Sequence, residues 1–440
     1  MADLNPSDLV PKIVALCKRR GIIFQNSEIY GGIQGFYDYG PIGSLMKLNW
    51  KNLWITDNVT RRNDVVLIDG SIITHSRVWE ASGHVSNFVD FLVECKSCHQ
   101  RFRPDLVNHA AKCPECGGEF THTRKYNLLF HTEIGVVEGE KLPAYLRGEA
   151  CQNIYLDFKN VVDSSRVKIP FSIAQIGKAF RNEITPKSFL YRTREFEQWD
   201  LQYFVHPAEM DKWFEYWKEQ RMYWYQKYFN HQDRLRFRQH AKDELAFYAQ
   251  KAFDIEFNTP WGWAEMEGIH WRSDYDLSQH SKFSGQDLSY TDPITHKKYL
   301  PWITETSGGV DRSFFFMLLD AYREDQLENG DIRTWLQLHP RVSAYKMAIF
   351  PLASNKPELV NKAADIYQYL KSRFAVDFDD SSNIGKKYRR YDEIGTPWCL
   401  TVDYQTLTDD TVTIRHRDTT KQIRLNTNEI DNWLDKHLNF

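Results

Sequence analysis

Apolar positions along the chain fall into helical and alternating patterns. Residues 9–68 predict a helix, a Gly- and Tyr-rich turn, and a second helix. From Tyr155 to Phe204, and again from Phe253 to Ile303, short apolar runs alternate with turns, which is typical of antiparallel strands. Ala208 to Tyr228 contains no Gly or Pro and predicts a helix, and the unbroken apolar run Ser313 to Tyr322 predicts a buried one.

A break near Leu338–Pro340 precedes a different pattern. Helices and strands then alternate as in a small α/β domain. We expect a buried strand over Tyr345–Leu352, an amphipathic helix over Glu358–Phe374, strands over Val376–Asp379 and Thr411–Arg417, and a last helix over Glu429–Leu438. The pattern therefore predicts two domains, residues 1–337 and 338–440.

Composition narrows the class of protein only slightly. With 440 residues, 42% of them hydrophobic and 26% charged, the chain can bury a large core. Aromatics at 15% favour a ring-rich core over a special ring-based site. A net charge of −3 does not indicate a nucleic-acid binder, although a local basic face would suffice for one. We expect no membrane span and no signal peptide, and therefore a cytoplasmic location.

Four of the seven cysteines form two C-x-x-C pairs, Cys95 with Cys98 and Cys113 with Cys116, within a polar segment. Two such turns can present four thiolates to one tetrahedral ion. We therefore predict a structural zinc site in an insertion at about 92–122, because four thiolates leave no position open for a substrate. The alternative is a site that has lost its metal.

Two further groups of residues suit a bound nucleotide. Phe180-Arg-Asn-Glu183 is followed by Tyr191-Arg-Thr-Arg-Glu-Phe196. Arginines can hold phosphate oxygens bidentately and an aromatic face can stack on a base. Glu305-Thr-Ser-Gly-Gly-Val-Asp-Arg312 leads into the apolar helix, where a helix N-terminus and an arginine favour an anion. A solvated hairpin with ordinary ion pairs is the alternative for the first group.

These stretches resemble class II aminoacyl-tRNA synthetases, in the dimeric glycyl-tRNA synthetase form. Phe180 to Phe196 resembles motif 2 of that family, Gly309-Val-Asp-Arg312 resembles motif 3, and Gly35-Phe-Tyr-Asp-Tyr-Gly-Pro-Ile-Gly43 resembles motif 1. Colinear matches continue at Val78–His84, Gln175–Gly177, Arg272–Leu277 and Gly385–Pro397. The resemblance implies an α+β fold: an antiparallel catalytic sheet flanked by helices, with the zinc insertion and a C-terminal mixed α/β anticodon-binding domain. It also implies a homodimer.

The implied reaction joins glycine to tRNA(Gly) with ATP and Mg²⁺ through a glycyl-adenylate. Such chemistry needs positioning and charge stabilisation but no protein nucleophile. The resemblance assigns catalysis to Arg181, Arg312 and Glu305. It assigns ATP binding to Arg181, Asn182, Glu183, Tyr191, Arg192, Arg194, Phe196, Glu265, Met266, Gly309 and Arg312, with Glu265 and Glu305 as Mg²⁺ or substrate ligands. Glycine binding falls to Arg103, Glu149, Phe196, Glu197, Asp200, Glu305, Ser307 and Gly309.

Several residues depart from the family pattern. The family's Arg-Pro-Glu-Thr-Ala-Gln-Gly loop is here Arg147-Gly-Glu-Ala-Cys-Gln-Asn153. Asp200 stands where a Glu is usual, Trp199 where a Met is usual, and His270-Trp271 where a small and polar pair is usual. Thr306 replaces the proline that usually follows the motif 3 glutamate. All of these changes fall near the amino-acid pocket, so adenylate chemistry is predicted more firmly than the amino acid.

Two other hypotheses stay open. One is the same scaffold with a different amino acid or acceptor, and the other is a non-catalytic nucleic-acid-binding paralogue. In the C-terminal domain, basic residues are candidates for tRNA phosphate contacts: Lys346, Lys386, Lys387, Arg389, Arg390, Arg415 and Arg417.

Overall fold

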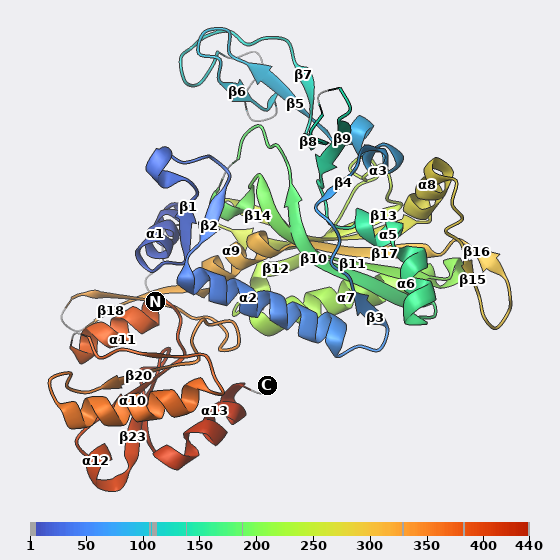
Figure 1. Ribbon diagram of the computed structural model, residues 1–440. Helices are drawn as coiled ribbons and strands as arrows, with labels where there is room; N and C mark the ends of the chain where they lie inside the picture. The colour runs from blue at the N-terminus through green and yellow to red at the C-terminus, as the bar shows by residue number, and fades with distance from the viewer. Residues whose placement is uncertain are drawn as a thin grey trace.

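The computed structural model describes residues 6–104, 107, 112–137, 139–186, 188–327, 330–381 and 383–438 (Figure 1). A large sheet with its helices forms one body, a small β-rich insertion projects from its top, and a second α/β body lies below the N-terminal helix. Within the described ranges, no helix is long and apolar enough to cross a membrane.

The large sheet has seven strands among the described residues, in the order β12-β13-β14-β17-β11-β10-β3. All neighbours pair antiparallel except β3, which runs parallel to β10. This confirms the predicted antiparallel sheet. The strands are β3 (Val65–Leu67), β10 (Phe171–Phe180), β11 (Glu195–Val205), β12 (Leu235–Gln239), β13 (Lys251–Thr259), β14 (Gly262–Ser273) and β17 (Trp302–Gly309).

Alternation along β11 separates the two faces of the sheet. Trp199, Leu201 and Tyr203 point into the main core, whereas Gln198 and Asp200 point to the other face. Helices α2 (Pro41–Ile55), α7 (Met210–Tyr228) and α9 (Val310–Ala321) cover the core face. The predicted ring-rich core is confirmed there by packed indole rings of α2, β11 and α7.

A buried ion pair joins α7 to the back of the sheet. Arg221 and Glu267 are both fully buried, and the guanidinium contacts the carboxylate at 2.5 and 3.0 Å. Tyr225 and Trp199 donate further hydrogen bonds to the same carboxylate. Every charge in this cluster is therefore compensated, as burial requires.

The remaining elements of this body are shorter. At the N-terminus lie α1 (Pro6–Arg19), β1 (Ile23–Gln25), η1 (Glu28–Tyr30), β2 (Tyr37–Tyr39) and η2 (Thr56–Thr60). The upper part holds β4 (Ile73–His75), α3 (Ser76–Ala81), α4 (His84–Asn87), β5 (Val89–Glu94), β6 (Arg101–Phe102), β7 (Arg124–Asn127), β8 (Phe130–Ile134) and β9 (Leu142–Leu146). Connections add η4 (Phe189–Tyr191), η5 (Pro207–Glu209), η6 (Gln232–Arg234), β15 (Tyr290–Thr291), β16 (Lys298–Tyr299), β18 (Tyr322–Gln326) and β19 (Ile332–Leu336).

Three helices interrupt regions that the sequence pattern assigned to strands. They are α5 (Gln152–Leu156), α6 (Phe158–Ser165) and α8 (Tyr275–Ser284). In α6, Phe158 and Val161 are buried at helical spacing, but the helix is too short for this periodicity to be recognised beside the strand that follows. Helix α9 also begins at Val310, three residues before the predicted start.

The C-terminal body is a mixed five-stranded sheet, counted within the described chain, in the order β21-β20-β22-β23-β24. Its first three strands are parallel and its last two antiparallel. Its elements are β20 (Met347–Pro351), α10 (Pro357–Lys371), β21 (Val376–Phe378), α11 (Ile384–Glu393), β22 (Trp398–Val402), α12 (Thr406–Asp409), β23 (Thr411–His416), β24 (Gln422–Asn426), η7 (Thr427–Glu429) and α13 (Ile430–Leu438). The predicted mixed α/β architecture is confirmed.

Most of the basic residues proposed for tRNA contacts prove to be structural. Lys387, Arg415 and Arg417 are buried, and Arg415 forms a two-point ion pair with Asp392. The Lys346 ammonium donates to the carbonyls of residues 340, 341 and 343. Charges so engaged are not available to phosphates, so that part of the prediction is wrong. Of the other three basic residues, Lys386 and Arg389 are exposed, whereas Arg390 forms an ion pair with Asp379 at 2.6 Å.

Candidate active site

A cavity of about 240 Å³ opens on the face of the large sheet that α7 leaves free. The hairpin between β10 and β11 forms one side of it, and β14, β17 and the start of α9 form the other. Many residues singled out in the sequence meet there: Glu149, Arg181, Glu183, Tyr191, Arg192, Phe196, Glu265, Glu305, Ser307, Gly309 and Arg312.

Arg181 and Phe196 face each other across the hairpin. The guanidinium carbon of Arg181 lies 5.3 Å from the centre of the Phe196 ring and 5.1 Å from that of Phe88. Its Nε donates to the carbonyl of Gly148 at 3.1 Å. The guanidinium is thus fixed against two rings with other N–H groups available to an anion.

Arg312 follows Gly309, the residue that precedes α9, and turns back over the hairpin. Its guanidinium lies 4.8 Å from the Tyr191 ring centre and 3.2 Å from a Glu265 carboxylate oxygen. Partial removal of Glu265 from water opposes its ionisation, but Arg312 and Arg181 lower the pKa of that carboxyl. Arg181 and Arg312 therefore bring a guanidinium into the cavity from each of the segments that resemble motifs 2 and 3, and Arg192 of the hairpin also lines it.

Glu183 lies at the mouth of the same hairpin and is nearly buried. Arg192 approaches its carboxylate at 3.6 Å while keeping a third of its own side chain exposed. A carboxylate in this position can accept a hydrogen bond from an amino group of a bound ligand.

Three residues predicted to bind ATP lie outside the cavity lining in the described structure. Asn182 donates to the hydroxyl of Tyr126, and Arg194 donates to the carbonyls of Glu183 and Gln34. These bonds brace the hairpin against neighbouring segments. Met266 packs in the core, because it is the extra residue of a bulge: Ile255 pairs with Glu267, and the next pair is Glu256 with Glu265.

Asp200 lies beneath the cavity on β11, fully buried. No hydrogen bond of normal geometry reaches either carboxylate oxygen from the described residues, although the Ser307 hydroxyl lies close enough to favour ionisation. Burial, followed by the nearby Glu305 carboxylate, raises the pKa of Asp200 well above its usual value. A buried carboxylate that no cation contacts directly is costly unless a ligand cation joins it.

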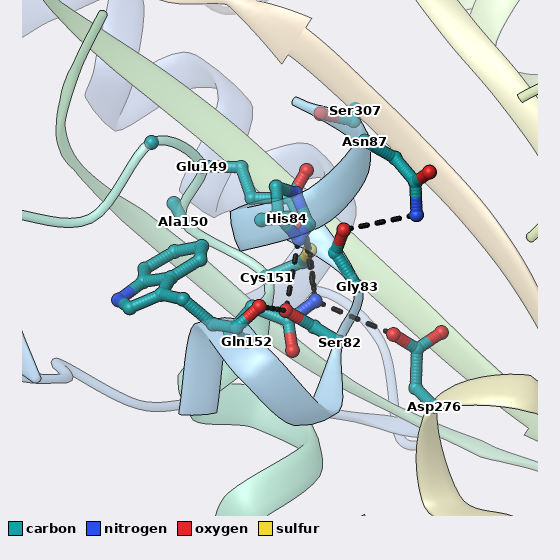
Figure 2. Close-up of polar contacts among 12 residues, drawn as sticks. Ser82, Gly83, His84, Asn87, Glu149, Ala150, Cys151, Gln152, Asp276 and Ser307 are labelled. Atoms are coloured by element: carbon teal, nitrogen blue, oxygen red, sulfur yellow. Dashed lines mark hydrogen bonds and ion pairs between the residues drawn. The ribbon is translucent and has the colours of Figure 1, made fainter. Parts of the chain in front are cut away.

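Glu149 is held from several sides in the loop Arg147–Asn153, whose sequence differs from the family pattern (Figure 2). Its Oε1 accepts from the Cys151 thiol at 3.0 Å and from Gln152 Nε2 at 2.9 Å, and His84 Nε2 lies 3.2 Å away. Although burial opposes ionisation, His84 is the main cause that lowers the pKa of Glu149 well below its usual value. The loop therefore keeps a fixed negative charge in spite of its altered sequence.

Glu305 has more hydrogen-bond and ion-pair partners than the sequence suggested. Arg272 Nη1 lies 2.9 and 3.0 Å from its two oxygens, Gln202 donates at 2.9 Å, and His270 Nδ1 lies 2.9 Å from Oε2. Burial opposes its ionisation, yet Arg272 and His270 lower the pKa of Glu305 to about 2. With these partners Glu305 fits a positioning role better than that of a metal ligand, whereas the half-exposed Glu265 remains open to a cation.

Two residues predicted to bind glycine lie elsewhere. Glu197 projects from the opposite face of β11, where Lys47 and Lys51 contact it at 2.6 and 2.8 Å. Strand alternation places it there, because Phe196 and Asp200 occupy the other parity. Arg103 lies in the insertion and contacts Asp90 at 3.3 Å. The structure therefore does not bring these two side chains to the cavity.

The sequence analysis missed several residues of the site. His84 reaches Glu149 from α4, His240 and Tyr248 line the cavity from the segment between β12 and β13, and Asp254 lines it from β13 itself. His84 lay in the matched stretch Val78–His84 without an assigned role, Asp254 lay in a predicted strand region, and His240 and Tyr248 lay in a segment with no predicted element. Their proximity depends on long-range pairing of strands.

The four predicted zinc ligands converge in the insertion. The sulfurs of Cys95, Cys98, Cys113 and Cys116 all lie within 4.8 Å of one another. The sulfur–sulfur distances are 3.4 Å between Cys95 and Cys116 and 3.7 Å between Cys98 and Cys113. Thiolates around a tetrahedral zinc ion lie about 3.8 Å apart. Gly117 has φ +72° in the second turn, a conformation that glycine favours. The donor set and its geometry fit zinc.

Two family models match the chain. The first is the tRNA synthetase class II core domain (G, H, P, S and T), over residues 136–390, and the second is the anticodon binding domain, over residues 346–437. The core match covers more than half of the chain and contains every described strand of the large sheet except β3, together with the residues that line the cavity. Fold and site thus define a class II aminoacyl-tRNA synthetase.

Curated relatives identify the family within that class. The chain is 49% identical over 427 residues to the glycine--tRNA ligase of Borreliella afzelii, covering 96% of each chain. It is 48% identical to that of Treponema denticola, with 95% of each covered, and 45% identical to that of Caldanaerobacter subterraneus, with 98% of each covered. The chain belongs to the glycine--tRNA ligase family.

Proposed function

We propose that this protein activates glycine with ATP, releasing pyrophosphate and forming a glycyl-adenylate, and then transfers the glycyl group to tRNA(Gly), releasing AMP. The observation that carries the choice of substrate is Asp200. Its buried carboxylate has no hydrogen-bonded counter-charge among the described residues and lies beside the cavity that contains Arg181 and Arg312. The ammonium of a small amino acid would supply the missing cation beside the phosphates of ATP.

In this proposal Arg181 and Arg312 hold the triphosphate from opposite sides. The adenine stacks on Phe196, and Glu183 accepts from its amino group. Catalysis then consists of aligning the glycine carboxylate with the α-phosphate while Arg181 stabilises the charge that develops there. Tyr191, Arg192 and Gly309 complete the nucleotide site, whereas Asn182, Arg194 and Met266 act indirectly through the shape of the hairpin and the bulge.

The glycine ammonium interacts with Asp200, and Ser307 and Glu149 lie next to it. Glu305 acts mainly as a positioning residue, because Arg272, Gln202 and His270 already occupy its oxygens. Magnesium bound at Glu265 would screen the phosphate charges, since hard oxygen ligands suit that ion. Zinc at the four cysteines would hold the insertion together.

The proposal also concerns assembly. Residues 1–337 form the catalytic domain and 338–440 the anticodon-binding domain. A homodimer would cover the apolar side chains of Ile29, Tyr30 and Ile33, which are 88, 87 and 50% exposed before the motif 1 segment. The reaction belongs in the cytoplasm, where charged tRNA is used.

Amino-acid-dependent exchange of labelled pyrophosphate into ATP tests the activation step. The protein is incubated with ATP, Mg²⁺ and each of the twenty amino acids separately. Exchange with glycine alone is expected. Exchange with another amino acid instead would overturn the substrate, and a folded protein that exchanges with none would overturn the proposed chemistry.

A further inference from the structure

Ser307 is the centre of a row of three cross-strand neighbours. It pairs with Asp200 of β11 on one side and with Gly268 of β14 on the other. In the adjacent row, Glu305 pairs with Gln202 and His270. The first row thus offers a carboxylate, a hydroxyl and then a position without a side chain.

The imidazole of His270 occupies the space above that position. A β-carbon at Gly268 would lie 2.6 Å from Cε1 of His270 and 3.3 Å from its Nε2. The ring belongs to the cavity lining and keeps 15% of its side chain exposed. His270 lies two residues along β14 from Gly268, and its ring forms a wall of the cavity over this cross-strand partner of Ser307.

The ring is enclosed on several sides. Its Nδ1 lies 2.9 Å from Oε2 of Glu305, which Arg272 itself holds, although the two atoms do not form a hydrogen bond of normal geometry. On other sides the rings of His240 and Tyr248 approach nearly edge-on, with centres 6.3 and 5.9 Å away. A side chain confined by a carboxylate and two rings cannot turn aside cheaply to admit a larger substrate.

We propose that His270 determines specificity for glycine by filling the space that the side chain of a larger amino acid would need. This inference rests on the proposed function. With the substrate ammonium at Asp200 and its α-carbon above Ser307, a β-carbon directed toward Gly268 meets the imidazole. Glycine has no such atom and fits beside it. The discrimination is therefore steric and belongs to the His270 ring.

The test compares pyrophosphate exchange with glycine, alanine and serine in the full-length protein and in His270→Ala. We expect the ratio of kcat/KM for alanine to that for glycine to rise at least about tenfold, the usual minimum effect of one carbon in a binding pocket. His270→Leu is the matched control, because it keeps a side chain of similar volume without the nitrogens. That variant should retain the wild-type ratio.

An unchanged ratio in His270→Ala would overturn the proposal, as would a His270→Leu variant that opens the pocket equally. Lower glycine activity without gain of alanine activity would make His270 a structural residue only. If circular dichroism shows that His270→Ala is unfolded, His270→Asn removes the ring with less disturbance, and the same two outcomes apply. Failure of the proposed function is distinct, because the wild-type protein would then show no glycine-dependent exchange.

Discussion

Asp200 and Ser307 are cross-strand partners on β11 and β17, and only the serine of this pair reaches the cavity surface. The carboxylate beneath it is fully buried. The pair therefore presents a hydroxyl at the surface and an unneutralised acid just below it, an arrangement that a ligand cation would complete.

Asp200→Asn should lower kcat/KM for glycine while leaving the affinity for ATP unchanged. A hydrogen bond to a charged group contributes about 1.5–3 kcal/mol, so kcat/KM for glycine should fall roughly 10- to 150-fold. In the wild-type protein the raised pKa of Asp200 means that a proton competes with the ammonium. The KM for glycine should therefore decrease as pH rises through that pKa, and Asp200→Asn should lose this dependence. Equal glycine affinity in the two proteins at every pH would contradict this role.

The same substitution should stabilise the fold at neutral and alkaline pH. A carboxyl whose pKa is higher in the folded than in the unfolded chain contributes stability below its unfolded pKa, which is lost as pH rises through the folded pKa. Asparagine carries no charge and avoids that loss. Urea unfolding at several pH values should give a stability difference in favour of Asp200→Asn that grows with pH from about pH 4 upward. A difference independent of pH would show that Asp200 ionises without cost.

Arg312→Ala should abolish adenylate formation without unfolding the protein. The guanidinium is partly exposed and its contacts are confined to the cavity edge, at Glu265 and Tyr191. Loss of a preorganised charge on the phosphates should reduce pyrophosphate exchange by at least about 100-fold. Arg312→Lys keeps the charge without the two-point geometry, so its rate of pyrophosphate exchange should lie between those of the wild-type protein and Arg312→Ala. Normal exchange in Arg312→Ala would remove this residue from the site.

Cys113→Ser should release the metal of the insertion. The wild-type protein should contain one zinc ion per chain, measured by elemental analysis after gel filtration, and the variant should contain markedly less. Cys399→Ser is the matched control, because Cys399 is equally buried but lies in the C-terminal sheet. Stoichiometric zinc in Cys113→Ser, or none in the wild-type protein, would contradict the predicted site.

Local patterns predicted much of this structure. The two C-x-x-C turns gave the cysteine cluster, since each turn positions its own ligands. Strand and helix periodicity gave the antiparallel sheet, α7 and the C-terminal α/β body. The colinear motifs placed Arg181, Phe196 and Arg312 in one cavity.

Other features depend on contacts that no local pattern contains. Alternation along β11 alone already places Glu197 and Asp200 on opposite faces of the sheet. The bulge at Met266, by contrast, changes which side chains of β14 face the cavity, and it can be recognised only from the pairing of β13 with β14. The partners of Glu149 and the wall at His270 come from distant segments. Burial of Arg415 and Arg417 likewise follows from packing within and around the C-terminal sheet.

Charging of tRNA tests the central claim most directly. The protein is incubated with ATP, Mg²⁺, tRNA and one labelled amino acid at a time, and acid-insoluble label on tRNA is counted. The account predicts that glycine alone is attached, to tRNA(Gly) and not to a tRNA with another anticodon. Attachment of a different amino acid, or no attachment of glycine by a folded protein, would contradict it.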